Sequence, residues 1–371
     1  MARILGLVNM HTSPELGAIT KNRSLATLPF LGRYAFVDIA LSNMSNSNIN
    51  TVGILVNKAP RSIIKHMDNA MSYTNNTKLG KTVILYNEKH ASNYLYNTDI
   101  NNIIENEWLV DEINYKYVLV APAHIIYRLD FNKVIEQHMA KNSAITCVYK
   151  KIHNGKTEWI DQDVFDVASS DGRLFQIRKN FGVDDEIDIS LETYLINIDK
   201  LKEILGFASE TSKFFNLKDA INYLCSMIKV DTYEYKGYAE IVKSTKDYLE
   251  KSLALLDFEH LNKVISNDWP IYTKTHDTPP AKYLENAWVR NSFVSNGAII
   301  NGKVENSVIC RDVQIKENAV IRNSIVLSGA EVAKEAVLEY VIVDKGAKIV
   351  NVKELRGTKE NPLYVGQGDI I

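Results

Sequence analysis

The sequence has few cysteines and no long apolar run. Its 371 residues include three cysteines, Cys147, Cys225 and Cys310, which lie far apart in the chain. This number and spacing exclude a disulfide framework and a cysteine-based metal site, and they fit a reducing cytosol. No run approaches the roughly 20 apolar residues that cross a bilayer. The apolar run near the N-terminus is too short for a secretory signal, so we expect a cytoplasmic protein.

An excess of charge is also missing. The formal net charge is −2, which gives no reason to expect nucleic acid as a partner. Hydrophobic residues make up 46% of the chain and charged residues 24%, as in ordinary globular proteins. A chain of this length is too long for one ordinary core, so two domains are expected.

The N-terminal residues predict a nucleotide-binding type of βαβ unit. Residues 4–8 suit a buried strand, a helix begins near Phe36, and residues 51–56 return as a second strand. In such sheets ligands bind outside the carboxyl ends of the strands, so the loop 9–17 should face a nucleotide or phosphate. A phosphate cradle needs glycines and free backbone N–H groups. The loop instead contains Met10, His11 and Glu15, and its one glycine comes last.

The pattern continues as alternating strands and helices up to residue 149. This alternation predicts a mostly parallel sheet with helices on both faces. The expected strands are 82–86, 117–121 and 144–149, and the expected helices are 59–73, 99–110 and 129–139. Residues 164–167 and 174–177 then alternate like an antiparallel pair. A strand at 189–198 and helices at 200–205, 217–228 and 244–255 follow.

A change of character near residue 270 divides the chain. Three prolines, Pro270, Pro279 and Pro280, mark a boundary, so we expect domains at 1–255 and 286–371 with a linker at 256–285. Beyond the boundary, apolar residues recur at intervals of 17, as in Val308, Ile325 and Ile342. Such repetition is typical of a parallel β-helix. A small β-sandwich is the alternative.

Residues 19–56 resemble the glucose-1-phosphate adenylyltransferases, a branch of the sugar nucleotidyltransferases. The match consists of Ile19 to Arg23, Leu28 to Phe30, Gly32 to Tyr34, Val37 and Asp38, Leu41 to Asn43, and Asn46 to Ile49. The resemblance implies a Rossmann-like α/β nucleotidyltransferase domain followed by a left-handed parallel β-helix. The left-handed hexapeptide type has about 18 residues in each coil, so a 17-residue unit implies one shortened turn.

The residues that carry chemistry in this family are mostly replaced here. The family transfers a nucleotidyl group from ATP to a sugar 1-phosphate, which requires Mg2+, basic side chains and backbone donors around the phosphates. The family's GGxGTRL loop falls on residues 10–16, which places its arginine at Glu15, and a lysine position falls on Leu25. The two metal-binding aspartates fall on His124 and Phe215, and neither side chain is a good magnesium ligand. Asp219, near the second position, is expected to be a helix residue instead.

Two positions retain the family's residue. Arg23 and Lys179 match an arginine and the lysine that contacts the sugar phosphate, so we expect at most residual substrate binding there. An exposed lysine on a strand edge is an equally simple interpretation of Lys179. No catalytic residue and no metal site are predicted for this chain.

The resemblance therefore points to the non-catalytic, GlgD-type branch of the family. It implies a regulatory or assembly subunit of a glucose-1-phosphate adenylyltransferase in glycogen synthesis, with a catalytic subunit as partner in a hetero-oligomer, a tetramer in this family. Mg2+ and ATP would belong to that holoenzyme, and a small-molecule effector is possible. One alternative is an active nucleotidyltransferase with an unusual loop, which requires both Arg23 and Lys179. Another is a sugar-phosphate or nucleotide sensor with an inert pocket.

Overall fold

The chain forms two compact units, and each unit combines segments that lie far apart in the sequence. The computed structural model describes residues 3–67, 73, 80–89, 93–112, 115–168 and 170–371. The first unit comprises Met1–Ser13, Ile39–Ala239 and Trp269–Tyr272, and the second comprises Pro14–Asp38, Glu240–Asp268 and Thr273–Ile371. These units are defined by contacts in space. The predicted domains 1–255 and 286–371 divide the chain along its sequence, and that division stays a prediction.

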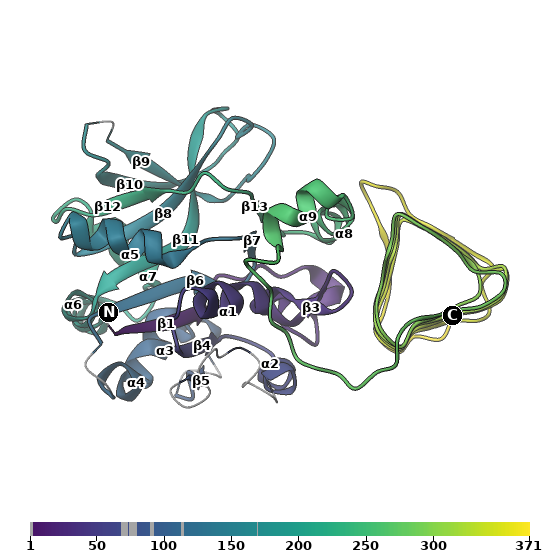
Figure 1. The fold of residues 1–371 in the computed structure, drawn as a ribbon. Helices are drawn as coiled ribbons and strands as arrows, with labels where there is room; N and C mark the ends of the chain where they lie inside the picture. Colours follow the sequence, from purple (N-terminus) through teal and green to yellow (C-terminus); the bar gives the residue numbers. More distant parts are fainter. Residues whose placement is uncertain (1–2, 68–72, 74–79, 90–92, 113–114, 169) are drawn as a thin grey trace. The chain divides into compact units, whose positions relative to one another are not determined.

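A mixed sheet runs through the first unit (Figure 1). Its parallel part has the order β6-β1-β4-β5, as the alternating pattern predicted. Strand β11 pairs antiparallel with β6 and with β8, and the predicted antiparallel pair β9 and β10 is present beyond it. The strands of this sheet are β1 (Ile4–Asn9), β4 (Thr51–Val56), β5 (Lys81–Tyr86), β6 (Tyr117–Pro122), β8 (Ile145–Ile152), β9 (Asp163–Val167), β10 (Leu174–Lys179), β11 (Ile187–Asn197) and β12 (Asp231–Glu234). Two short strands, β7 (Ile125–Tyr127) and β13 (Ala239–Ile241), lie outside this sheet.

Helices cover both faces of this sheet. Successive side chains of a strand point to opposite faces, so the neighbours of successive β1 residues show which helices lie on each face. A Cβ on Gly6 would lie 2.7 Å from Met44 Sδ of α1 (Phe36–Asn46). Leu5 and Leu7 belong to a core cluster that includes residues of four helices, namely α3 (Asp99–Glu105), α4 (Glu107–Asp111), α6 (Ile198–Thr211) and α7 (Leu217–Leu224). The remaining helices are α2 (Pro60–Met67) and α5 (Phe131–Ala140), with the short 3-10 turn η4 (Tyr94–Tyr96).

Two predicted helices differ from what the periodicity indicated, one by a break and one by an earlier end. The helix predicted at 99–110 is divided at Asn106, whose side-chain amide donates to the backbone oxygens of Asn102 and Tyr86. Such side-chain bonds to the backbone compete with the helix. The helix predicted at 217–228 ends at Leu224. Part of the helix predicted at 59–73, residues 68–72, lies outside the described residues.

The second unit contains a parallel β-helix whose coils form a triangle in Figure 1. Val304 pairs with Ile321, Ile321 with Leu338 and Leu338 with Leu355, so these partners are 17 residues apart, as predicted. The edges depart from this repeat, because Val289 pairs with Val304 and Ile342 pairs with Tyr364. Three five-stranded parallel sheets contradict the β-sandwich alternative. Their strands are β14 (Lys282–Tyr283), β15 (Trp288–Arg290), β16 (Phe293–Val294), β17 (Ile299–Ile300), β18 (Lys303–Glu305), β19 (Val308–Ile309), β20 (Gln314–Ile315), β21 (Val320–Arg322), β22 (Ile325–Val326), β23 (Glu331–Val332), β24 (Val337–Glu339), β25 (Val341–Val343), β26 (Lys348–Ile349), β27 (Glu354–Arg356) and β28 (Leu363–Val365).

The segment 14–38 is part of the same unit as the β-helix. Arg23 donates to the buried Asp344 of the β-helix, and a Cβ on Gly32, whose φ is +76°, would lie 2.5 Å from Ser295 Oγ. Tyr248 on α8 donates to the Pro29 backbone oxygen over 2.6 Å. These contacts hold the segment in place independently of any ligand. Its elements are η1 (Gly17–Thr20), η2 (Leu25–Thr27), β2 (Pro29–Phe30) and β3 (Tyr34–Ala35), and the unit's helices are α8 (Thr245–Ala254) and α9 (Phe258–Val264).

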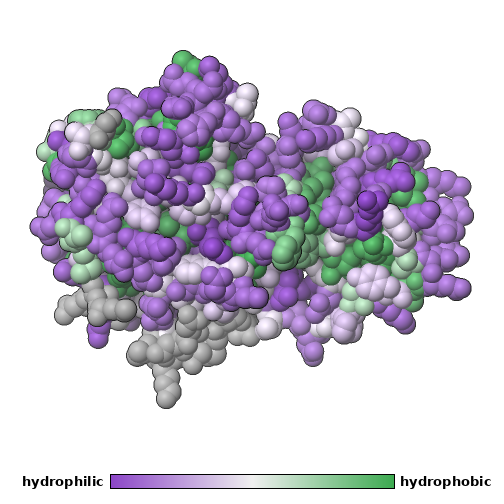
Figure 2. All heavy atoms as spheres, turned by 45° about the horizontal axis from the view of Figure 1, so that its top comes forward, coloured by the Kyte–Doolittle hydropathy of each residue, from purple (hydrophilic) through white to green (hydrophobic). Residues whose placement is uncertain are grey.

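Across the described part of the chain, no helix combines the length and apolar character needed to cross a membrane. Figure 2 shows a face covered mainly by hydrophilic residues, with smaller hydrophobic patches between them.

Candidate functional site

Three backbone N–H groups of the loop after β1 donate hydrogen bonds within the protein. Met10 N donates to Leu55 O over 3.1 Å, His11 N donates to Asn9 Oδ1 over 2.9 Å, and Ser13 N donates to Met10 O over 3.3 Å. A phosphate cradle presents such N–H groups to its ligand. In this loop they are already paired within the protein.

The His11 side chain fixes this closed arrangement. Its Nδ1 lies 3.0 Å from Asn97 O, and its Nε2 lies 3.0 Å from Asn102 Nδ2. One nitrogen must donate and the other accept, which a neutral ring with its proton on Nδ1 can do. Burial lowers the pKa of His11 to about 4, and the hydrogen bond to Asn97 offsets this only in part. His11 is therefore a neutral side chain at neutral pH, and it supplies no positive charge to a phosphate.

Asp99 lies behind the loop as a buried structural carboxylate. It accepts hydrogen bonds of 2.8 Å from Asn9 Nδ2, from Leu217 N and from Ile100 N. Burial raises the pKa of Asp99 to about 6, against the opposing effect of these three donors. The three bonds tie β1 to α3 and α7, so they account for the Asp99 oxygens without a metal.

His124 and Glu192 form a buried pair in the same unit. His124 Nε2 lies 3.6 Å from Glu192 Oε1, and Gln162 Nε2 donates to that oxygen over 2.7 Å. The two side chains are 1% and 9% exposed. Burial alone would raise the pKa of Glu192, but His124, with smaller contributions from Thr12 and Gln162, lowers it to about 2. The carboxylate is therefore ionised across the physiological range.

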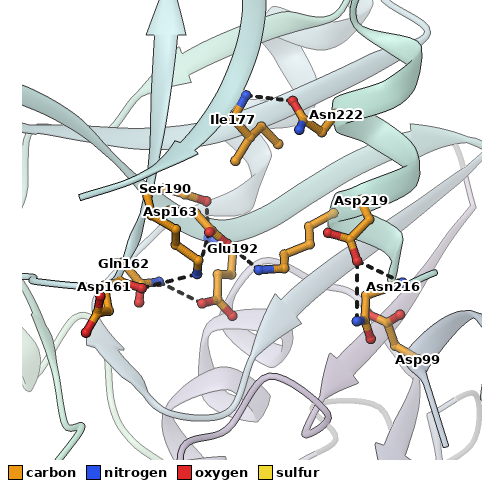
Figure 3. Close-up of polar contacts among 12 residues, drawn as sticks. Asp99, Asp161, Gln162, Asp163, Ile177, Ser190, Glu192, Asn216, Asp219 and Asn222 are labelled. Carbon is orange, nitrogen blue, oxygen red and sulfur yellow. Dashed lines mark hydrogen bonds and ion pairs between the residues drawn. The ribbon is translucent and has the colours of Figure 1, made fainter. Parts of the chain in front are cut away.

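Two lysines share one carboxylate next to this pair. Lys179 Nζ lies 2.7 Å from Asp163 Oδ1, and Lys218 Nζ lies 2.9 Å from Asp163 Oδ2. Burial alone would lower the pKa of Lys218, but Asp163, with smaller contributions from Asp219 and Glu192, raises it. Figure 3 shows Asp163, Gln162 and Glu192 side by side, with Asp219, Asn216 and Asp99 across from them. The site thus carries paired charges of both signs.

The structure brings only some of the predicted positions together. Lys179 and His124 both lie beside the segment that carries Gln162 and Asp163. Phe215 stacks on Phe207 with ring centroids 6.1 Å apart. Asp219 accepts from the Asn216 backbone N–H in a capping box at the start of α7, as expected for a helix residue.

Three other positions belong to the second unit. Arg23 is bound to Asp344, Leu25 is buried in η2, and Glu15 is exposed. The Arg23 guanidinium therefore already has an anionic partner inside the protein.

Sequence reasoning missed Glu192, Gln162, Asp163 and Lys218. One signal was available, because Glu192 is the one carboxylate in the strand predicted at 189–198, which is otherwise free of charge. Buried charges are costly unless they are paired, so this residue needed an explanation.

The residues present do not fit a magnesium ion. Magnesium prefers octahedral oxygen ligation with carboxylates and water. Asp99 accepts three donors, Asp163 holds two lysines, Glu192 faces His124, and Asp219 caps α7. Among the residues that the structure describes, no group of three or more His, Cys, Asp or Glu side chains could hold a metal.

Comparisons with known proteins agree with the architecture. A nucleotidyl transferase model matches residues 15–157, and a model described as GlmU-like, C-terminal hexapeptide matches residues 279–358. The chain is 28% identical over 377 residues to the glycogen biosynthesis protein GlgD of Bacillus subtilis (strain 168), covering 99% of this chain and 96% of that protein. It is 25% identical over 312 residues to the glucose-1-phosphate adenylyltransferase of Clostridium novyi (strain NT), covering 83% and 81%. The same enzyme of Clostridium botulinum (strain Alaska E43 / Type E3) is 28% identical over 315 residues, covering 83% and 80%.

The two domain models match the expected order of a nucleotidyltransferase domain and a left-handed hexapeptide β-helix. The relatives include both a GlgD protein and adenylyltransferases. The comparisons therefore confirm the resemblance to the glucose-1-phosphate adenylyltransferase family and to its GlgD-type branch.

Proposed function

We propose that this chain is a regulatory or assembly subunit of a glucose-1-phosphate adenylyltransferase in bacterial glycogen synthesis, with little or no turnover of its own. Its partner is a catalytic subunit, in a hetero-oligomer for which the family resemblance implies a tetramer. The proposed place of action is the cytoplasm. ATP and Mg2+ belong to the catalytic partner.

The observation that carries this proposal is the closed loop after β1. Phosphoryl and nucleotidyl transfer depend on preorganised donors and positive charge around the phosphates. The N–H groups of Met10, His11 and Ser13 donate within the protein, and the neutral His11 side chain is held between Asn97 and Asn102.

The magnesium positions support the same proposal. His124 and Phe215 offer no carboxylate where the resemblance expects one, and the nearby acids already have protein partners. A subunit of this kind changes its partner's activity by binding the partner's active conformation more tightly than the inactive one.

The test is turnover by the purified chain, alone and mixed with a catalytic adenylyltransferase chain from the same organism. ATP, Mg2+ and glucose 1-phosphate are supplied, and pyrophosphate release is measured. We expect no turnover above background from the chain alone and a change in the partner's kcat or KM on mixing. The partner mixed with an equal amount of serum albumin is the control. Robust turnover by the chain alone would contradict the proposal.

A restored loop provides a second test. The variant His11→Gly combined with Glu15→Arg replaces two of the altered loop positions. We expect it to remain inactive alone, because His124 and Phe215 still leave the metal without carboxylates. Full activity in this variant would show that our assignment of the metal positions is wrong.

A sensor function is the second candidate, because Lys179 and Lys218 still place two ammonium groups at one site. Calorimetry of the unmodified chain with glucose 1-phosphate, ATP and ADP-glucose separates it from a subunit that binds none of them.

A further inference from the structure

An open cleft of about 480 Å³ lies within the second unit, between α8 and one corner of the β-helix. Small-molecule sites in proteins have volumes of roughly 300–1,000 Å³. The α8 side of the cleft is an apolar wall that includes Leu249 and Leu253. The β-helix side is a column of four side chains, here called the corner column: Asn291, Asn306, Asn323 and Tyr340. The cleft therefore suits a ligand that has both an apolar and a polar surface.

The corner column follows from the coil repeat. Each of its four residues comes directly after one strand of the sheet β15-β18-β21-β24, so successive members lie one coil apart. All four have a left-handed backbone, with φ between +42° and +52°. Asparagine tolerates this conformation, which by itself explains the first three members. It does not explain Tyr340, because the same conformation costs a bulky residue about 1–3 kcal/mol, and such strain gathers at functional sites.

Most polar groups of the corner column are free to bind a ligand. Asn291 Nδ2 donates to Asn306 Oδ1 over 2.8 Å. Among the described residues, no hydrogen-bond partner is found for Asn306 Nδ2, for the side-chain amide of Asn323 or for the Tyr340 hydroxyl. The corner does not need these groups, since backbone hydrogen bonds such as that from Asn323 N to Glu305 O hold it. They can therefore donate to and accept from a bound molecule.

The cleft carries no net charge. The two charged residues among those that line it, Glu250 on α8 and Lys359, pair with each other over 3.3 Å. A phosphorylated ligand would lose hydration here without meeting an unpaired cation. A ligand with uncharged hydroxyl groups has no such cost, because each asparagine amide both donates and accepts. The lining thus favours a neutral, hydroxyl-rich molecule.

We propose that this cleft binds an uncharged sugar, with its hydroxyl groups on the corner column and its apolar ring faces against Tyr340 and the α8 leucines. The strain at Tyr340 then has a function, because it adds an aromatic side chain to a column of amides. The choice of a glucose oligomer as the sugar rests on the proposed role in glycogen synthesis, whereas the site itself does not. The readout is binding, so a failure here can be told apart from a failure of the turnover test.

The experiment measures binding of maltotriose to the full chain by calorimetry, and we expect saturable binding. Tyr340→Asn gives the fourth coil the residue of the three coils before it, so it removes the ring and relieves the backbone. The double variant Asn306→Gly with Asn323→Gly removes two amides, and glycine adopts the left-handed backbone without strain. Each should bind maltotriose at least about tenfold more weakly than the unmodified chain. Circular dichroism checks that both variants are folded, and either one alone is sufficient for the test.

The matched control is Asn318→Gly. Asn318 also has a left-handed φ, +57°, and it is exposed on the same β-helix, but it does not line the cleft. Its variant should keep the affinity of the unmodified chain. Lys359→Met should keep it as well, because an exposed ion pair contributes little and the sugar carries no charge. No saturable binding by the unmodified chain would overturn the inference, as would equal affinity in Asn318→Gly and in the folded cleft variants. Displacement of maltotriose by excess inorganic phosphate would overturn the assignment to an uncharged ligand.

Discussion

Each unit contains a buried carboxylate that faces a basic side chain, and the two pairs are built differently. In the β-helix unit, Asp344 accepts hydrogen bonds from the Arg23 guanidinium, from Tyr364 Oη over 2.6 Å and from the backbone N–H of Lys345 over 2.6 Å. Both oxygens of Asp344 are used, while Arg23 Nη1 is buried without a hydrogen-bond partner among the described residues. In the sheet unit, Glu192 has one short hydrogen bond, a histidine 3.6 Å away and one unpartnered oxygen. Of the four residues in these two pairs, only Glu192 has a left-handed backbone.

The difference shows two ways in which a fold holds a buried carboxylate. Removing either partner of the Arg23–Asp344 pair leaves a buried charge without compensation. At Glu192 the left-handed backbone costs stability, whereas the lowered pKa of the carboxyl shows that its surroundings stabilise the charge. Arg23 and Lys179, the two positions that retain the family's residue, both bind a carboxylate of the protein, Asp344 and Asp163.

The largest effect on the free energy of unfolding is expected at the Arg23–Asp344 pair. Asp344→Ala leaves the Arg23 guanidinium buried and unpaired, so we expect a loss of about 3–5 kcal/mol in the free energy of unfolding. Urea unfolding followed by circular dichroism measures it. Glu285→Ala, at an exposed position on the same β-helix, is the control, with an expected change below about 0.5 kcal/mol. Equal losses in both variants would remove the distinction between the two pairs.

A smaller effect is expected where two lysines share Asp163. Lys179→Met and Lys218→Met each leave one lysine on the carboxylate, so each should cost below about 1 kcal/mol. The double variant leaves the buried Asp163 unpaired and should cost about 2–3 kcal/mol, more than the sum of the single changes. A double-mutant cycle in urea measures the coupling. Additive costs would show that the two lysines do not substitute for each other.

The closed loop should make stability depend on pH through His11. Its pKa is about 4 in the folded chain and about 6.5 when unfolded, so the unfolded chain binds more protons between these values. Stability is therefore lost as the pH falls from 6.5 to 4, by about 2 kcal/mol at pH 5. His11→Asn removes this titration, and Asp99, present in both proteins, cancels in the comparison. A stability difference between the two proteins that is equal at pH 7 and pH 5 would contradict a neutral, buried His11.

The smallest effect on stability is expected at the His124–Glu192 pair. Glu192→Gly removes a left-handed conformation worth about 1–3 kcal/mol, which offsets the lost contacts. We expect the free energy of unfolding to stay within about 1 kcal/mol of the unmodified chain, measured by urea unfolding as above. A loss of about 3 kcal/mol or more would mean that Glu192 holds the fold as Asp344 does.

The β-helix was the most predictable part of the molecule. Its contacts join residues at a fixed spacing, so apolar residues such as Val308, Ile325 and Ile342 reveal both the register and the core. The exceptions lie at the edges, where Val289 pairs with Val304 and Ile342 with Tyr364. Those spacings depend on the lengths of the turns between strands, and the sequence repeat does not indicate these lengths.

The candidate site was far less predictable. Residue types at His11, His124 and Phe215 indicated what the site lacks, but not what fills it. Glu192 meets a partner 30 residues away at Gln162, and the direction of its side chain depends on a local shift in strand register. Arg23 lies 321 residues from Asp344, and no pattern in either segment indicates the pair. Contacts of this kind depend on the complete fold.

The separation of Arg23 from Asp344 has a consequence for biosynthesis. The second unit includes residues 14–38, yet the coil that carries Asp344 is made almost at the end of the chain. At about 5–20 residues per second, a ribosome needs roughly 15–60 s to cover this interval. Throughout that time the early segment is exposed to other binding partners in the cell, without the acid that later neutralises its arginine. Chaperones that recognise such early segments would therefore act on this chain before its C-terminal coils emerge.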